Sequence, residues 1–313
     1  MKALVYQKFG PPENLVISDL ARPEACSHEV LVRVAYAGVN SVDWKIGAGR
    51  IDHYRNAPFP LVTGRDFSGT VVEVGSHVRN FSVGDAVIGC LPGPGGSFAE
   101  YVATDALSLA RAPSNLTLAE AASIPLVGLT CWQALVGSAK LSKGEVLYVL
   151  SGAGGTGSIA VQLGAALGAK VITTCSERNR DYVTGLGANY IFDYSKPNFT
   201  DDLIAEFPQG VDVVFSNVLG PLHRDAYRTL RPGGILVTIG ESPLPAVAEK
   251  HGVDEIDLIV QPNGKQLTEI VTYLENGTIK PPSVSIHALV HGAHAMQNIS
   301  EGHVRGKIVL QVS

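Results

Sequence analysis

The sequence lacks any long apolar run. Nowhere in its 313 residues is there a stretch near the roughly 18 consecutive apolar residues of a membrane-spanning helix. Residues 1–6 already have the pattern of a strand, and no signal peptide precedes them. We therefore expect no membrane insertion and a cytoplasmic location.

Cysteine and positive charge are also scarce. The four cysteines are scattered, and none forms a C-x-x-C pair, so a structural zinc site is not expected. Isolated thiols are typical of a reducing compartment. The net charge of −5 gives no electrostatic basis for binding nucleic acid.

Short alternating strands and glycine turns dominate residues 1 to about 115, which predicts a barrel-like β module. Helical composition follows over residues 113–144. The predicted strands are Val30–Ala35, Gly69–Gly75 (compact and buried), Asp85–Gly89 and Phe98–Val102, and the predicted helices are Ala119–Ser123 and Thr130–Ala139.

From Glu145 onward, strands alternate with helices, which predicts an α/β fold with a doubly wound parallel sheet. The last strand, Lys307–Val312, is expected to rejoin the N-terminal module. The cofactor domain, 121–264, is then inserted between 1–120 and 265–313. The predicted strands are 146–150, 170–174, 190–192, 211–215 and 234–239, and helical lengths separate them at 158–168 and 222–230.

The most informative motif is a glycine turn between a strand and a helix. Gly152, Gly154 and Gly157 have the spacing G-x-G-x-x-G, with Gly155 and Thr156 between the last two. Such a turn lets backbone amides and a helix N-terminus approach a pyrophosphate closely. A second strand follows, as the motif requires, so we predict dinucleotide binding.

Further short motifs stand in order along the chain: 37–43 (AGVNSVD), 64–69 (GRDFSG), 83–87 (VGDAV), 128–130 (GLT), the glycine turn, 230–234 (LRPGG) and 306–310 (GKIVL). Together they make the chain resemble the medium-chain dehydrogenase/reductase superfamily, and most closely its zinc-free quinone oxidoreductase branch. The resemblance covers nearly the whole length. It implies a Rossmann domain inserted in a GroES-like β-barrel catalytic domain, NADPH-dependent hydride transfer to a quinone, and a homodimer. The alternative acceptor is an α,β-unsaturated ketone or aldehyde (an enone or alkenal).

Departures from zinc-dependent members indicate that no metal is bound. Asn40 stands where those enzymes have a cysteine ligand, and Arg65 and Asp66 stand where they have His-Glu. An amide and a guanidinium do not replace a thiolate and an imidazole on zinc. A competing metal site would use His287 and His291, four apart as on one helix face, with His294 and His303 nearby; the plainer interpretation is a solvated helix.

The turn after the second strand bears on the choice of cofactor. Ser176 falls where an NADH-specific enzyme would have an acid, and Arg178 and Arg180 suit a 2′-phosphate. Both arginines also fit a helix surface, and Glu177, if turned inward, favours NADH. By resemblance Tyr194 also holds the phosphate, although Asn179 replaces the family's lysine. We predict NADPH.

Further site residues follow from the resemblance. Thr130 is expected near the nicotinamide carboxamide, and Lys307 near the cofactor, although an exposed terminal charge is the alternative for Lys307. Asn217 and Gly240, within 217–219 and 239–241, follow strands whose carboxyl ends collect ligands.

The substrate side rests on fewer residues. Asn40 is a candidate donor to the developing oxyanion, or else a turn residue that caps local backbone. Asp43 reads as structural. Trp44 and Tyr54 are either walls for a flat substrate or core residues.

Two other functional classes remain open. The chain could bind NADPH with little turnover, as a redox-sensing or RNA-associated protein, although no basic–aromatic stripe supports RNA binding. An enoyl-thioester reductase is the other, for which Arg50, His53 and Arg55 offer the only basic groove.

Overall fold

The computed structural model describes residues 1–240, 242–302 and 304–313, so Glu241 and His303 lie outside the described residues. The chain divides into two compact units. Unit 1 comprises Met1–Leu129, Gln261–Gly277 and Pro281–Ser313, and unit 2 comprises Thr130–Val260 and Thr278–Lys280.

Unit 2 is built on a parallel sheet of six strands. Their order is β11-β10-β9-β12-β13-β14, and each neighbouring pair is parallel. Numbered along the chain, this is the order 3-2-1-4-5-6 of a doubly wound sheet, as the alternating pattern predicts. The strands are β9 (Val146–Val149), β10 (Lys170–Cys175), β11 (Tyr190–Asp193), β12 (Val211–Ser216), β13 (Leu230–Thr238) and β14 (Asp254–Asp257).

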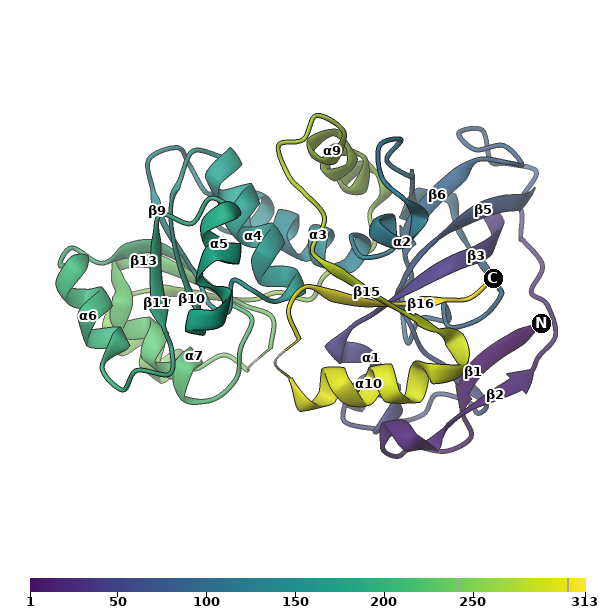
Figure 1. Ribbon diagram of the computed structural model, residues 1–313, viewed down its shortest axis with the longest axis horizontal. Coiled ribbons are helices and arrows are strands. Elements are labelled where there is room, and N and C mark those ends of the chain that lie inside the picture. Colours follow the sequence, from purple (N-terminus) through teal and green to yellow (C-terminus); the bar gives the residue numbers. More distant parts are fainter. Residues whose placement is uncertain (241, 303) are drawn as a thin grey trace. The chain divides into compact units, whose positions relative to one another are not determined.

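Helices connect these strands. Figure 1 shows α4 and α5 beside β9, β10 and β11, and both helices contact β10. Apolar side chains of the central strands, such as Tyr148, Ile172 and Val214, are buried between the layers. The helices are α4 (Gly155–Ala166), α5 (Arg180–Gly185), α6 (Phe199–Glu206), α7 (Pro221–Ala226) and α8 (Pro245–His251), with a π-helical segment at Trp132–Ser138.

Unit 1 is a β-rich module with two sheets. The larger has the order β15-β16-β3-β5-β6-β8, with β7 also paired to β3, and the smaller has the order β2-β1-β4. The strands are β1 (Lys2–Tyr6), β2 (Leu15–Asp19), β3 (Glu29–Val39), β4 (Leu61–Val62), β5 (Asp66–Val74), β6 (Ala86–Cys90), β7 (Tyr101–Asp105), β8 (Leu109–Arg111), β15 (Val284–Ala288) and β16 (Lys307–Gln311).

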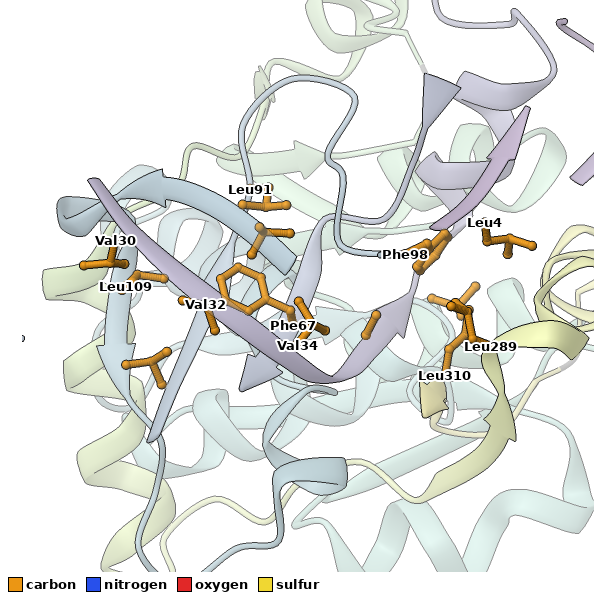
Figure 2. Close-up of a cluster of buried hydrophobic side chains, with 14 of the residues drawn as sticks. Leu4, Val30, Val32, Val34, Phe67, Leu91, Phe98, Leu109, Leu289 and Leu310 are labelled. Carbon is orange, nitrogen blue, oxygen red and sulfur yellow. The ribbon is translucent and has the colours of Figure 1, made fainter. Parts of the chain in front are cut away.

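The core of unit 1 follows the alternation along β3. Val30, Val32 and Val34 point to one side of the strand, and Figure 2 shows them gathered with Phe67 and other buried side chains. Leu310 of β16 belongs to the same cluster, and β16 pairs antiparallel with β3. The end of the chain therefore rejoins the N-terminal module, as predicted.

Among the described residues, α-helices accompany these sheets. They are α1 (Ser41–Gly47), α2 (Leu118–Ala121), α3 (Pro125–Cys131), α9 (Gly264–Glu275) and α10 (Gly292–Glu301). The boundary between the units falls within α3, between Leu129 and Thr130.

Two element predictions were misplaced. The strand predicted at Phe98–Val102 begins only at Tyr101, because Phe98 and Ala99 pair with β1 instead, through Leu4 N–H donating to Phe98 O at 2.8 Å. The helix predicted to begin at Thr130 starts at Pro125, whose fixed φ suits the first turn of a helix.

The helical interpretation of His287 and His291 was wrong. His287 lies on β15, where Ile286 and its neighbours pair with β16, and His291 ends a short 3₁₀ turn before α10. Only His294 is on that helix. Within residues 1–240, 242–302 and 304–313, no helix combines the length and apolar character that crossing a membrane requires.

Candidate active site

The glycine turn joins β9 to α4 at the carboxyl edge of the parallel sheet. Ser151 has a positive φ of 57°, and Gly152 N–H donates to Thr174 O at 2.9 Å, which ties the turn to β10. Helix α4 begins at Gly155, and its N-cap Gly154 gives its first amides no side-chain partner. Unpaired amides at a helix N-terminus suit an anionic ligand.

The three motif glycines differ in what surrounds them. A Cβ at Gly152 would lie 2.2 Å from Thr173 Oγ1, and one at Gly157 would lie 2.1 Å from Ser151 O. A Cβ at Gly154 would meet no atom closer than 3.7 Å, and its φ of −75° suits any residue. Packing explains two of the glycines, whereas Gly154 leaves open backbone at the position where a pyrophosphate approaches in such turns.

Most of the predicted cofactor residues lie along the same edge. Ser176 directly follows β10, Tyr194 follows β11, Asn217 follows β12 and Gly240 lies two residues beyond β13. The strand order reverses direction between the neighbours β9 and β12. In such sheets the ligand crevice lies between the loops that follow these two strands. Asn217 Oδ1 is buried and has no hydrogen-bond partner among the described residues.

The turn after β10 separates the two arginines. Arg180 Nε donates to both Glu177 carboxylate oxygens, at 2.9 and 3.1 Å, and its Nη1 donates to Ile191 O at 3.4 Å. Arg178 is exposed and has no ion pair or hydrogen bond within the described part of the chain. Glu177 is therefore neutralised by Arg180, while the guanidinium of Arg178 stays available.

A buried polar network lies in unit 1 at the end of β3. Lys307 is only 4% exposed, and its Nζ donates to Val39 O at 3.0 Å, to Asp66 Oδ2 at 3.2 Å and to Asn40 Oδ1. Asn40 Nδ2 donates to Asp66 Oδ2 at 2.9 Å. The alternative of an exposed terminal charge at Lys307 was therefore wrong.

These side chains do not fit a zinc ion. Asp66 contacts an amide and an ammonium group, and Arg65 Nε donates to Leu91 O at 3.0 Å, so among Asn40, Arg65, Asp66 and Lys307 only Asp66 is a conventional zinc ligand. In the described ranges no three His, Cys, Asp or Glu side chains form a group that could hold a metal. His287 and His294 have ring centroids 6.4 Å apart.

Asp43 is fully buried next to this network. Its Oδ2 accepts the backbone N–H of Asn40 at 2.8 Å, and its Oδ1 has no partner among the described residues. The pKa of Asp43 is raised to about 7, chiefly by burial; the hydrogen bond from Asn40 opposes this rise, and the charge of Asp66 contributes to it. This geometry fits the structural role expected for Asp43.

The two aromatic candidates both pack against the unit 1 core. Trp44 and Tyr54 are half-buried, and Trp44 also lies under Arg50, whose Cζ is 4.8 Å from a ring centroid. Trp44 and Arg50 line a cavity of about 530 Å³. Arg55 is paired with Asp52 at 2.8 Å, which weakens the basic groove considered for a thioester substrate.

Sequence reasoning missed a buried relay in unit 2. Ser216, the last residue of β12, shares a 2.9 Å hydrogen bond between its Oγ and His223 Nδ1. Tyr227 OH is 3.4 Å from His223 Nε2 and donates to Glu255 of β14. The sequence signal that could have indicated this hydrogen bond was a serine at the end of a strand, followed by a histidine near the start of the next helix. Full burial of Ser216 and His223 makes this a network that holds the β12–α7 loop rather than a hydrolytic triad.

Comparisons with known proteins agree with this architecture. The family model described as "Alcohol dehydrogenase GroES-like domain" matches residues 26–114, and that described as "Zinc-binding dehydrogenase" matches residues 186–310.

Two curated relatives are from Arabidopsis thaliana. The "NADPH-dependent alkenal/one oxidoreductase, chloroplastic" is 33% identical over 322 residues, covering 99% of this chain and 79% of the relative. The "Chloroplast envelope quinone oxidoreductase homolog" is 32% identical over 329 residues, covering 99% and 98%. The solved structure of a quinone oxidoreductase from Coxiella burnetii matches with a TM-score of 0.91 and 31% identity, covering 100% of this chain and 99% of that one.

Proposed function

Because the chain belongs to the medium-chain dehydrogenase/reductase superfamily, in its quinone oxidoreductase branch, we propose that it reduces quinones with NADPH and without zinc. NADPH, when bound, supplies the hydride, and the residues of this chain bind, orient and shield it. Enones and alkenals are the alternative acceptors, favoured by the name of the alkenal/one oxidoreductase relative.

The observation that carries the cofactor proposal is the open backbone at Gly154. Neither the backbone conformation nor the packing at this position requires glycine, so we infer that a ligand needs the space that a side chain would fill. We assign the pyrophosphate to the amides of Gly155 and Thr156 at the N-terminus of α4, beside Gly154, whose own N–H donates to Ser151 O at 3.3 Å. Asn217 and Gly240 follow the strands on the other side of the switch point.

The preference for NADPH over NADH rests on the turn after β10. The 2′-phosphate is assigned to Ser176 and Arg178, with Tyr194 after the neighbouring strand. Arg180 supports this choice indirectly, because its ion pair with Glu177 compensates the carboxylate that precedes Arg178 and would repel a phosphate.

The acceptor is assigned by its chemistry. In the network around Asp66, the ammonium of Lys307 and both N–H groups of Asn40 already have protein acceptors, among them Gly38 O at 3.4 Å from Asn40 Nδ2. An electron-poor quinone or enone needs little acid catalysis, so such an acceptor suits a site whose donors are largely engaged. The contact of Asn40 with the oxyanion requires it to exchange one of these bonds. Thr130, Trp44 and Tyr54 keep their predicted contacts as proposals, whereas the three N–H groups of Lys307 already face protein acceptors.

The proposal that no zinc is needed is supported by the donor set at Asn40 and Arg65, although one matching family model is described as zinc-binding. A homodimer and a cytoplasmic location also remain predictions, and the two plant relatives carry chloroplast names.

The experiment is a steady-state screen at 340 nm with NADPH in excess. 9,10-Phenanthrenequinone represents the quinones, and a short alkenal and a cyclic enone represent the alternative. A higher kcat/KM with the quinone supports the main proposal, and a higher kcat/KM with the alkenal or enone selects the alternative. No NADPH oxidation with any of these acceptors refutes both. Tight NADPH binding with no turnover would indicate the redox-sensing role.

A further inference from the structure

Lys307 is a buried cation whose hydrogen-bonding capacity is used up. It lies at the start of β16, and its three N–H groups face three acceptors: the carbonyl of Val39, the amide oxygen of Asn40 and the carboxylate of Asp66. An ammonium group has three donors, so this environment leaves none for a ligand. We conclude that Lys307 acts on the reaction through its partners rather than by contact.

Asp66 carries the effect of Lys307 to a helix. Its Oδ2 binds Lys307 and Asn40, while its Oδ1 accepts the backbone N–H of Leu126 at 2.6 Å. Leu126 is the second residue of α3, where helix amides lack a partner within the helix. Asp66 is fully buried, so these donors supply the hydrogen bonds that water does not.

Helix α3 also carries a proposed cofactor residue. Thr130 follows Leu126 by four residues, which is about one helical turn, and the two therefore lie on the same side of α3. Whatever fixes the first turn of this short helix fixes the direction of the Thr130 side chain. The packing of α3 on α9 is close as well, since a Cβ at Gly128 would lie 3.3 Å from Ile270.

We propose that Lys307 is a positioning residue for hydride transfer: through Asp66 it holds α3 in the orientation at which Thr130 receives the nicotinamide carboxamide. This inference rests on the proposed function, because it needs Thr130 to touch the nicotinamide. The ammonium of Lys307 balances the carboxylate of Asp66, and the carboxylate anchors the helix. Near the place where zinc-dependent relatives hold their metal, this chain has an internal ion pair.

The test compares Lys307→Met, Thr130→Ala and their combination, with Lys2→Met as the matched control on an exposed lysine paired to Asp19. The readouts are kcat and KM with phenanthrenequinone, the NADPH Kd from fluorescence, and Tm. Lys307→Met is expected to lower kcat 10- to 100-fold and to change Kd less than threefold, since a small misplacement of the reacting groups costs about this much. Thr130→Ala should lower kcat similarly, and the combination should be no worse than either alone.

A second variant guards against a folding defect. Asp66→Asn combined with Lys307→Met removes the unpaired charge and retains an amide oxygen for Leu126, so this pair should recover part of the lost kcat. If Lys307→Met weakens NADPH affinity tenfold and the double variant does not recover kcat, Lys307 contacts the cofactor directly. If Lys307→Met lowers Tm but leaves kcat per binding site unchanged, its role is purely structural. Either result overturns the proposal. If the wild type itself neither binds nor oxidises NADPH, the proposed function fails instead.

Discussion

Substitution of Gly154 separates ligand binding from folding, because its neighbour Gly157 is constrained differently. A Cβ at Gly154 meets no atom within 3.7 Å, and φ is −75°, so Gly154→Ala should leave Tm unchanged or raise it by about 1–3 °C through reduced unfolded-state entropy. A Cβ at Gly157 lies 2.1 Å from Ser151 O, so Gly157→Ala should cost about 1–3 kcal/mol and lower Tm by about 3–10 °C.

The effect on cofactor binding should be the reverse of the effect on stability. The added methyl of Gly154→Ala keeps the backbone amides from the pyrophosphate, and loss of one or two hydrogen bonds to a charged group, at about 1.5–3 kcal/mol each, predicts a rise in NADPH Kd of about 10- to 100-fold or more. Gly154→Val should abolish detectable binding. Thermal melts and NADPH fluorescence titrations provide the two readouts. A folded Gly154→Val protein that binds NADPH with wild-type affinity would refute the assignment of the turn.

Three other variants or treatments test separate parts of the account. Arg178→Ala should lower kcat/KM for NADPH about tenfold and leave kcat/KM for NADH unchanged. This loss corresponds to the lower end of the range for a charge-assisted hydrogen bond, because Arg178 is exposed. Arg228→Ala is the control, and an unchanged ratio of kcat/KM for the two cofactors would remove Arg178 from the phosphate site. The pKa of Asp43 is raised from 3.8 to about 7, so its protonation stabilises the folded state fully below about pH 4, and this stabilisation is lost as pH rises through 7. At about 1.36 kcal/mol per pKa unit, the loss in the free energy of unfolding is at most about 4 kcal/mol. Urea unfolding should therefore show a pH slope that Asp43→Asn flattens, and equal slopes in both proteins would contradict this. Treatment with a strong chelator should not change NADPH oxidation, whereas a loss restored by Zn²⁺ would show a metal requirement.

The sequence was sufficient for the architecture because each unit follows a simple period. Strict strand–helix alternation predicted the parallel sheet of unit 2, and the alternation over Val30–Ala35 predicted a strand there, which lies within β3. The placement of Phe98–Val102 failed for a different reason. Those residues alternate well, yet the first of them pair with β1, some 95 residues earlier, which no local pattern contains.

At the candidate site, the sequence predicted the glycine turn and the loops after β10 and β12, because a βα unit fixes where these residues lie. It did not predict which charges compensate one another. The pairing of Glu177 with Arg180 rather than Arg178, and the burial of Lys307 against Asp66, depend on side-chain directions and on contacts across 241 positions of the chain. The same limit applies to Ser216 and His223, whose hydrogen bond depends on the turn of α7.

A crystal structure of the protein with NADPH is the most direct measurement. The account predicts the pyrophosphate on the amides of Gly155 and Thr156 beside Gly154, the 2′-phosphate against Ser176 and Arg178, and no metal ion at Asn40 and Asp66. A dinucleotide bound away from the carboxyl edge of the sheet, or a zinc ion at Asp66 in an active preparation, would contradict it.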